Sequence, residues 1–176
     1  MEDDRHIAAT PLSSPTPIGS VMVVGAGIAG VQAALDMANL GFKVYLVERE
    51  AAIGGKMAQL DKTFPTNDCS MCILSPKLIE CDRNPNIEII TLAEVEDIQG
   101  EPGRFKVSLV KKPRYIDEDR CTNCGQCSLY CPLKVPDPYN EGMSEVKNLH
   151  IHFAQAIPAT PYLDPTKCLY MTKGVC

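Results

Sequence analysis

The chain has 176 residues, enough for one ordinary domain or for one domain that carries a small insert. Its 45% hydrophobic and 22% charged residues are typical of a globular protein. The net charge of -5 argues against a nucleic-acid-binding surface, which needs a basic stripe. No apolar run approaches the roughly 18 residues of a transmembrane segment, so none is expected.

Residues 1–19 are rich in Pro, Ser, Thr and acids but lack the apolar segment of a secretory signal. We therefore expect a flexible leader. Nine cysteines in a chain without such a signal favour metal clusters over disulfides, because the cytosol keeps thiols reduced. This composition predicts a cytoplasmic protein.

A strand, a glycine-rich turn, a helix and a second strand are predicted after residue 20. An apolar run leads into Gly25-Ala-Gly27-Ile-Ala-Gly30, and apolar residues at helical spacing follow. Gly41 would end the helix, and residues 43–48 have the character of a buried parallel strand that ends at Glu48. A G-x-G-x-x-G turn in this context indicates a Rossmann-like dinucleotide-binding domain of the α/β class.

The glycines have distinct expected roles. Gly25 permits the tight turn, Gly27 admits the pyrophosphate and Gly30 lets helix and strand pack closely, while Glu48 would accept hydrogen bonds from ribose hydroxyls. A turn without a ligand is the alternative. Glu48 followed by Gly54 and Gly55 resembles the Glu-x5-Gly-Gly sequence of flavoproteins with two dinucleotide-binding domains, which favours FAD over NAD. The predicted cofactor-binding residues are Gly25, Gly27, Gly30, Glu48, Gly54, Gly55 and Lys56.

Three cysteines lie in the segment that follows. Cys69 and Cys72 form a C-x2-C pair, which can hold half of a metal site, act as a redox disulfide or be two buried thiols. In a chain that carries further cysteine motifs we favour metal ligands. Cys81 lies in a predicted helix and is expected to be a packed apolar thiol.

Residues 87–92 and 105–109 are predicted as two strands, with a turn at 100–103 between them. They are expected to form a small antiparallel excursion from the nucleotide-binding fold. Beyond them, the sequence shows regularly spaced cysteines and no helical or strand periodicity. This change predicts a domain boundary near residue 114.

Cys121, Cys124, Cys127 and Cys131, followed by a proline, form the C-x2-C-x2-C-x3-C-P run of iron–sulfur proteins. Zinc is the weaker alternative, because it usually takes two C-x2-C pairs about 15–20 residues apart. In two-cluster ferredoxins the fourth cysteine ligates the other cluster, so a second motif is predicted, and Cys168 and Cys176 would belong to it. The predicted metal ligands are Cys69, Cys72, Cys121, Cys124, Cys127, Cys131, Cys168 and Cys176.

Prolines are frequent between residues 132 and 165, which predicts a mostly extended linker between the cysteine groups. His150 and His152 are two residues apart, so a strand would carry both on one face. A metal role is conceivable, but a solvated strand face is the preferred interpretation.

The order of these motifs resembles the family of A subunits of the CoB–CoM heterodisulfide reductases. The resemblance rests on the flavin turn, on Thr66-Asn-Asp-Cys-Ser-Met-Cys-Ile-Leu-Ser-Pro76, on Pro85-Asn-Ile87 and on the ferredoxin run, and it extends from Ser20 to Cys176. It implies an incomplete FAD-binding domain at residues 20–114 and an incomplete ferredoxin-like 2[4Fe-4S] insert at 115–176. A second polypeptide or a continuation is expected to complete both.

The resemblance also implies a function. The preferred one is electron transfer by an FAD and [4Fe-4S] oxidoreductase subunit within a multi-subunit anaerobic complex, with electron bifurcation in some members. No catalytic side chain is predicted. The alternatives are an FAD and iron–sulfur dehydrogenase that acts directly on a small molecule, and a structural scaffold that carries clusters.

Overall fold

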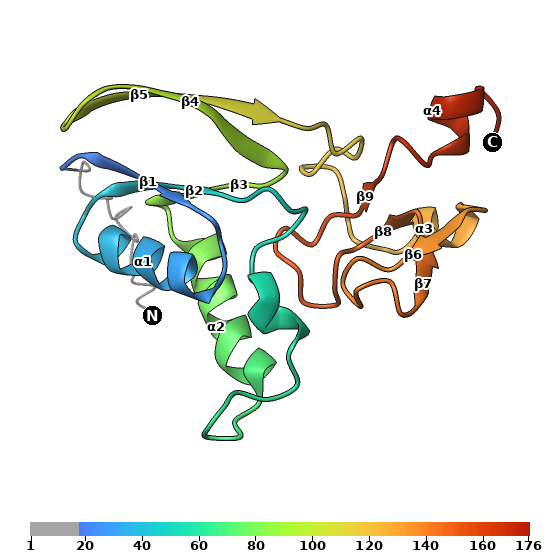
Figure 1. Cartoon of the computed structure of the whole chain (residues 1–176), viewed down its shortest axis with the longest axis horizontal. Coiled ribbons are helices and arrows are strands. Elements are labelled where there is room, and N and C mark those ends of the chain that lie inside the picture. Colours follow the sequence, from blue (N-terminus) through green and yellow to red (C-terminus); the bar gives the residue numbers. More distant parts are fainter. Residues whose placement is uncertain (1–17) are drawn as a thin grey trace, which may run out of the picture.

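A three-stranded parallel sheet lies at the centre of the N-terminal half of the computed structural model, which describes residues 18–176 (Figure 1). Its strands are β1 (Ser20–Val24), β2 (Lys43–Val47) and β3 (Ile87–Ile90), in the order β1-β2-β3. The leader expected at residues 1–19 lies outside the described residues, apart from its last two. The parallel β1-helix-β2 unit confirms the predicted nucleotide-binding topology.

Two helices, α1 (Ile28–Asn39) and α2 (Ser70–Arg83), cover one face of the sheet (Figure 1). The buried residues of α1 recur at helical spacing, and Gly41 follows the helix with a φ of 91°. Such a backbone angle suits glycine, so the predicted helix end is confirmed. The short 3-10 helix η1 (Gly55–Gln59) lies between β2 and α2, and Cys81 of α2 is fully buried, as predicted.

The strands after α2 differ from the prediction. The strand at Ile87 joins the parallel sheet, and the antiparallel hairpin consists instead of β4 (Ala93–Glu101) and β5 (Arg104–Lys111). Sequence analysis missed β4 because the strand is largely exposed and because the irregularity between Val95 and Asp97 interrupts its alternation of apolar and polar residues. The predicted pairing of residues 87–92 with the hairpin is therefore wrong, although the turn at 100–103 is correct.

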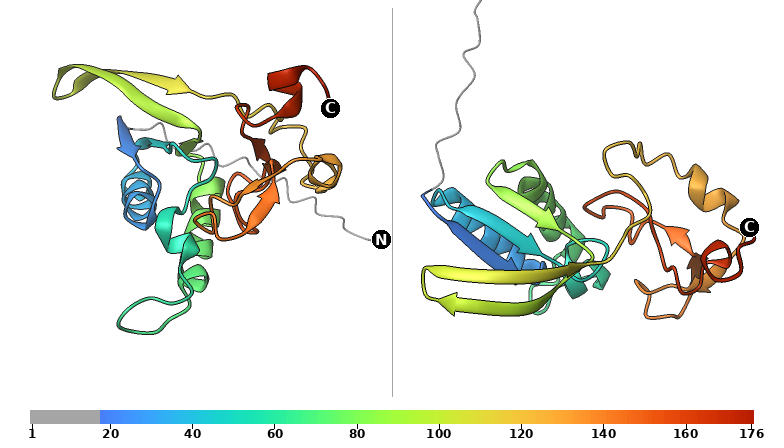
Figure 2. Two further views of the ribbon diagram at one scale, coloured as in Figure 1. Left: turned by 45° about the vertical axis from the view of Figure 1, so that its right-hand side comes forward. Right: turned by 90° about the horizontal axis from the view of Figure 1, so that it is seen from above.

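The second half consists of short elements joined by loops. Strands β6 (Lys134–Pro136) and β7 (Glu145–Lys147) pair, as do β8 (Leu149–His150) and β9 (Tyr162–Leu163), and α3 (Gln126–Tyr130) and α4 (Leu169–Lys173) are single-turn helices. Figure 2 shows this half beside the sheet domain.

The segment predicted to be an extended linker also packs against the sheet domain, which the sequence did not predict. Phe153 and Ala156 belong to the same buried core as Leu46, Ile53 and Leu74 of the sheet domain. Apolar side chains thus fix this proline-rich segment against the first half.

Over residues 18–176, none of the helices combines the length and apolarity required to cross a membrane.

Candidate functional site

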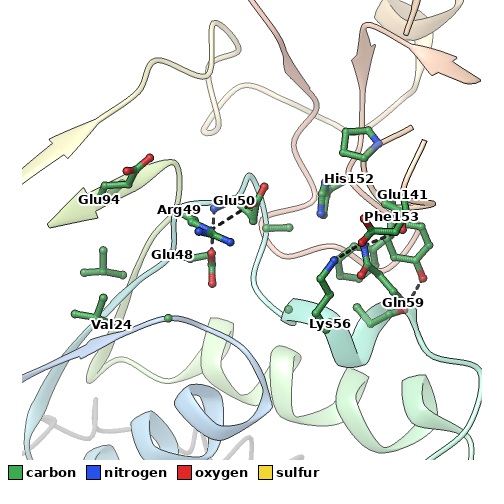
Figure 3. A pocket seen from close by; sticks show the side chains of 18 of the residues that line it. Val24, Glu48, Arg49, Glu50, Lys56, Gln59, Glu94, Glu141, His152 and Phe153 are labelled. Carbon is green, nitrogen blue, oxygen red and sulfur yellow. Dashed lines mark hydrogen bonds and ion pairs between the residues drawn. The ribbon is translucent and has the colours of Figure 1, made fainter. Parts of the chain in front are cut away.

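A cavity of about 720 Å³ lies beyond the carboxyl ends of β1 and β2 (Figure 3). In open α/β sheets this edge is where ligands bind. Of the predicted cofactor-binding residues, Gly25, Glu48, Gly55 and Lys56 line the cavity. Gly27, Gly30 and Gly54 lie in the backbone that supports these four.

Glu48 is held in place by the glycine turn. The side chain is buried, and its Oε2 accepts a hydrogen bond of 2.8 Å from the Ala26 N–H. Its Oε1 accepts one of 3.0 Å from the Glu50 N–H. Each carboxylate oxygen retains a further lone pair, so the group can still accept hydrogen bonds from ribose hydroxyls.

The glycine segments pack too closely for larger residues. A Cβ added at Gly30 would lie 1.9 Å from the Gly25 carbonyl oxygen, and one added at Gly55 would lie 2.9 Å from the Cα of Gly27. The Gly54 N–H donates a hydrogen bond of 2.7 Å to the Ala26 carbonyl, which joins the two segments.

Open space lies next to the turn itself. A Cβ added at Gly25 or Gly27 would meet no atom within 4 Å. No other atoms of residues 18–176 thus cover the backbone where a pyrophosphate would approach, and the carboxylate of Glu48 lies beside it. The chemistry and shape of these residues fit a bound dinucleotide, although their individual roles stay predictions.

The second half of the chain supplies the other end of this cavity, which sequence analysis missed. Pro138, Tyr139, Glu141, His152 and Phe153 are among the lining residues. Figure 3 shows Glu141, His152 and Phe153 grouped around Lys56 and Gln59 of η1, away from Glu48. No local pattern predicts contacts between residues more than eighty positions apart.

Arg114, at the predicted boundary, is a second residue that the sequence did not single out. Its side chain is 5% exposed. The guanidinium donates hydrogen bonds to the Thr160 carbonyl at 2.9 Å, the Ala51 carbonyl at 2.7 Å and Thr91 Oγ1 at 2.7 Å. Its Nε also lies 2.6 Å from Glu118 Oε1 as an ion pair, without hydrogen-bond geometry. Arg114 therefore connects the sheet domain with the second half.

Cys69 and Cys72 are joined to each other. The structure has a disulfide between them, and Cys69 caps the N-terminus of α2. Of the possibilities that the sequence left open, the structure shows the pair in the bonded form. Their assignment as metal ligands stays a prediction, and it would require the disulfide to be reduced first.

The cysteines of the ferredoxin run are free thiols, as are Cys168, which precedes α4, and Cys176, which follows it. A hydrogen bond from the Gln126 backbone, with a smaller contribution from the Thr122 hydroxyl, lowers the pKa of Cys124. This shift favours the thiolate, which is the form that binds metal.

These thiols are of the type that binds iron–sulfur clusters, but in the part of the chain that the structure describes they do not converge on one site. Within residues 18–176, no three side chains of His, Cys, Asp or Glu converge closely enough to hold a metal ion. The donor chemistry thus fits an iron–sulfur cluster, while the ligand set of each cluster stays a prediction.

The two histidines do not lie on a solvated face, so that interpretation is wrong. His150 is 6% exposed, and its ring packs 4.8 Å from the ring of Tyr162, because β8 pairs with β9. Burial lowers the pKa of both His150 and His152. Neither nitrogen of His150 has a hydrogen-bond partner within the described residues, nor does Nδ1 of His152.

Comparison with known families defines the class of protein. A profile described as "FAD dependent oxidoreductase" matches residues 20–68, and one described as "4Fe-4S binding domain" matches residues 114–136. The chain therefore combines part of an FAD-dependent oxidoreductase fold with a ferredoxin-type segment. These matches indicate FAD and [4Fe-4S] clusters as its cofactors.

Curated relatives narrow this class to one family. A protein of Archaeoglobus profundus, named as similar to the A subunit of heterodisulfide reductase, is 54% identical over 95% of this chain and 23% of its own length. The A subunit of the H(2):CoB-CoM heterodisulfide,ferredoxin reductase of Methanothermobacter thermautotrophicus is 51% identical over 84% of this chain and 22% of its own length. Over these residues the chain belongs to the family of heterodisulfide reductase A subunits. It spans less than a quarter of the length of either relative.

Among solved structures, the L-proline dehydrogenase of P. horikoshii is 24% identical with a TM-score of 0.44, over 53% of this chain and 20% of that one.

Proposed function

We propose that this chain binds FAD and [4Fe-4S] clusters within an electron-transfer subunit of a multi-subunit oxidoreductase. The cavity beside β1 and β2 carries the proposal, because the anchored Glu48 and the bare backbone of Gly25 and Gly27 border a site that is continuous with the cluster-bearing half. Bound FAD exchanges electrons in pairs or singly, whereas iron–sulfur clusters exchange single electrons.

The chain's own residues would bind and orient these groups. Glu48 would hold the ribose, and the glycine turn at the start of α1 would receive the pyrophosphate at the positive end of the helix dipole. Residues 20–114 would form the flavin part and residues 115–176 the cluster part. Cys121, Cys124 and Cys127 would ligate one cluster, and Cys131 would join Cys168 and Cys176 at another, both completed from elsewhere in the assembly.

The name of the Methanothermobacter relative includes both heterodisulfide and ferredoxin. We infer that the assembly containing this chain delivers electrons to two different acceptors, which is the requirement for electron bifurcation. A cytoplasmic location accompanies this function, because cluster thiols need a reducing compartment. Redox titration of the intact assembly tests this inference. Accumulation of a stable one-electron-reduced flavin would contradict bifurcation.

The experiment that tests the proposal is anaerobic purification of the protein in the assembly in which it occurs, followed by measurement of FAD and iron. Glu48→Ala should lower the FAD content, because it removes the ribose acceptor and leaves the Ala26 and Glu50 amides unpaired. Glu88→Ala is the matched control, since this half-exposed glutamate lies on β3 and does not line the cavity. Equal FAD content in both variants would refute the proposed flavin site.

Iron content tests the cluster part separately. Cys121→Ala should lose iron, whereas Cys81→Ala should retain it, because Cys81 is packed in the core of the sheet domain. Iron loss in neither variant would show that the C-x2-C-x2-C-x3-C-P run does not hold a cluster.

A further inference from the structure

One wall of the proposed flavin cavity belongs to the cluster-bearing half of the chain. Tyr139, His152 and Phe153 line the cavity there with aromatic rings. Figure 3 shows Glu141 beside His152 and Phe153. Glu48 lies toward the other end of the cavity. A dinucleotide whose ribose is bound by Glu48 would extend toward this second wall.

The wall is fixed rather than loosely apposed. The Gln59 side chain donates a 2.8 Å hydrogen bond to the Tyr139 carbonyl, and the Tyr139 hydroxyl donates one to the Ala58 carbonyl. Lys56 forms an ion pair with Glu141, and the Ile53 N–H donates a 2.9 Å hydrogen bond to the Ile157 carbonyl. Residues of the first half that adjoin or line the cavity are thus tied to this segment by several polar contacts.

His152 is the polar side chain of this wall that makes no hydrogen bond or ion pair with another described residue. It lines this cavity and also a second one of about 530 Å³. The aromatic rings of Tyr139, Phe153 and Tyr162 surround it at centroid distances of 6.2, 5.9 and 6.1 Å. Its Nδ1 is inaccessible to solvent and does not face the cavity, whereas its Nε2 is not among the buried unpartnered atoms and makes no hydrogen bond within the described residues, so Nε2 is the nitrogen that a bound molecule can reach.

We propose that His152 is a binding residue for the flavin nucleotide, which it contacts by a hydrogen bond from the cluster side of the cavity. This inference rests on the proposed function. Burial lowers the pKa of His152, so the imidazole is neutral near pH 7 and offers one N–H donor and one acceptor nitrogen. The rings of Tyr139 and Phe153 would add apolar contact around it.

The proposal also links cofactor binding to docking of the second half. A nucleotide that contacts residues of both halves stabilises their association by its own binding free energy. Addition of FAD should therefore slow amide hydrogen exchange in residues 138–153 as well as around Gly25. Binding to the glycine turn alone would protect only the first half.

The test uses the protein in its intact assembly, purified anaerobically, stripped of FAD and titrated with FAD while flavin fluorescence is recorded. His152→Leu should raise the dissociation constant about 5- to 30-fold, as expected for the loss of one buried hydrogen bond. His152→Gln, which can still donate and accept, should stay within about threefold of the unmodified protein. His150→Gln is the matched control, because His150 lines only the second cavity.

The outcomes separate this inference from the proposed function. Absence of FAD binding by the unmodified assembly would refute the proposed function. FAD binding that His152→Leu leaves unchanged, or that His150→Gln weakens equally, would refute the role of His152 alone. If His152→Leu fails to fold, hydrogen exchange of the unmodified protein decides, and unchanged exchange at residues 138–153 on FAD addition overturns the inference.

Discussion

Replacing Arg114 by methionine should separate the two halves of the chain without altering the flavin turn. Methionine keeps an unbranched apolar side chain, like the aliphatic part of arginine. It removes the N–H groups that donate to the carbonyls of Ala51 and Thr160 and to Thr91 Oγ1. These acceptors come from both halves and would remain buried without partners. The change therefore tests whether this one guanidinium maintains the contact.

The magnitude follows from the burial of these groups. Hydrogen bonds from a charged donor contribute about 1.5–3 kcal/mol each, and removal of one partner of a buried charged network costs about 3–5 kcal/mol. The ion pair adds little, since Glu118 is 43% exposed and screened by solvent. We therefore expect a loss of about 3–5 kcal/mol for Arg114→Met, and a smaller loss for Arg114→Lys, whose single ammonium cannot reach all three acceptors.

Limited proteolysis of the intact assembly measures this loss at the contact itself. A change of about 3–5 kcal/mol raises the population of the opened form at least about 100-fold, so cleavage within residues 112–120 should accelerate accordingly. Arg104→Met is the matched control, because Arg104 is exposed at the start of β5. Its effect should stay within about 0.5 kcal/mol. Equal cleavage rates in the two variants would refute the reasoning.

Three further predictions concern the core and the buried titratable groups. Gly30→Ala should destabilise the protein by about 3 kcal/mol or more in urea unfolding, because its Cβ would meet the Gly25 carbonyl oxygen. Gly19→Ala is the control, because a Cβ there makes only ordinary contacts. Equal effects of the two substitutions would contradict the packing argument. Burial raises the pKa of Cys81 to about 11, so at about pH 8 iodoacetamide should modify it much more slowly in the native than in the unfolded protein, as followed by mass spectrometry, and equal rates would show that the thiol is accessible. Burial lowers the pKa of His150 and His152, so below about pH 6.5 the unfolded chain binds protons that the native protein does not, and stability should fall as pH decreases from about 7.5 to about 5.5. His150→Gln should reduce this slope in urea midpoints, and an unchanged slope would assign it to other groups.

The parts of the fold that the sequence predicted are those encoded locally. The glycine turn and the end of α1 at Gly41 depend on residues a few positions apart, and Glu48 was found from the fixed distance in sequence at which an acid follows such a turn. Strand β4 escaped prediction because it is largely exposed and the irregularity between Val95 and Asp97 interrupts its apolar alternation. The position of His152 at the cavity escaped it because the wall around His152 is joined to η1 by contacts such as that of Gln59 with Tyr139, eighty positions apart.

The same distinction applies to the candidate site. Four cysteines at the spacing of a ferredoxin run identified the chemistry, since ligand type follows from residue type. The spacing did not predict the contacts of Arg114, whose partners lie 23, 46 and 63 positions away. Such partners are determined by tertiary packing, which no single-sequence period encodes.

The shared core also restricts how this protein could be divided or recombined. Phe153 is 8% exposed and Ala156 is 3% exposed within the core that contains Leu46 and Leu74. A cut near residue 114 would therefore leave a hole in the sheet domain and an apolar surface on the released fragment. Engineers who graft this cluster segment onto another flavoprotein would need to transfer the matching face of the sheet domain with it, so the unit of exchange is larger than the cysteine motif.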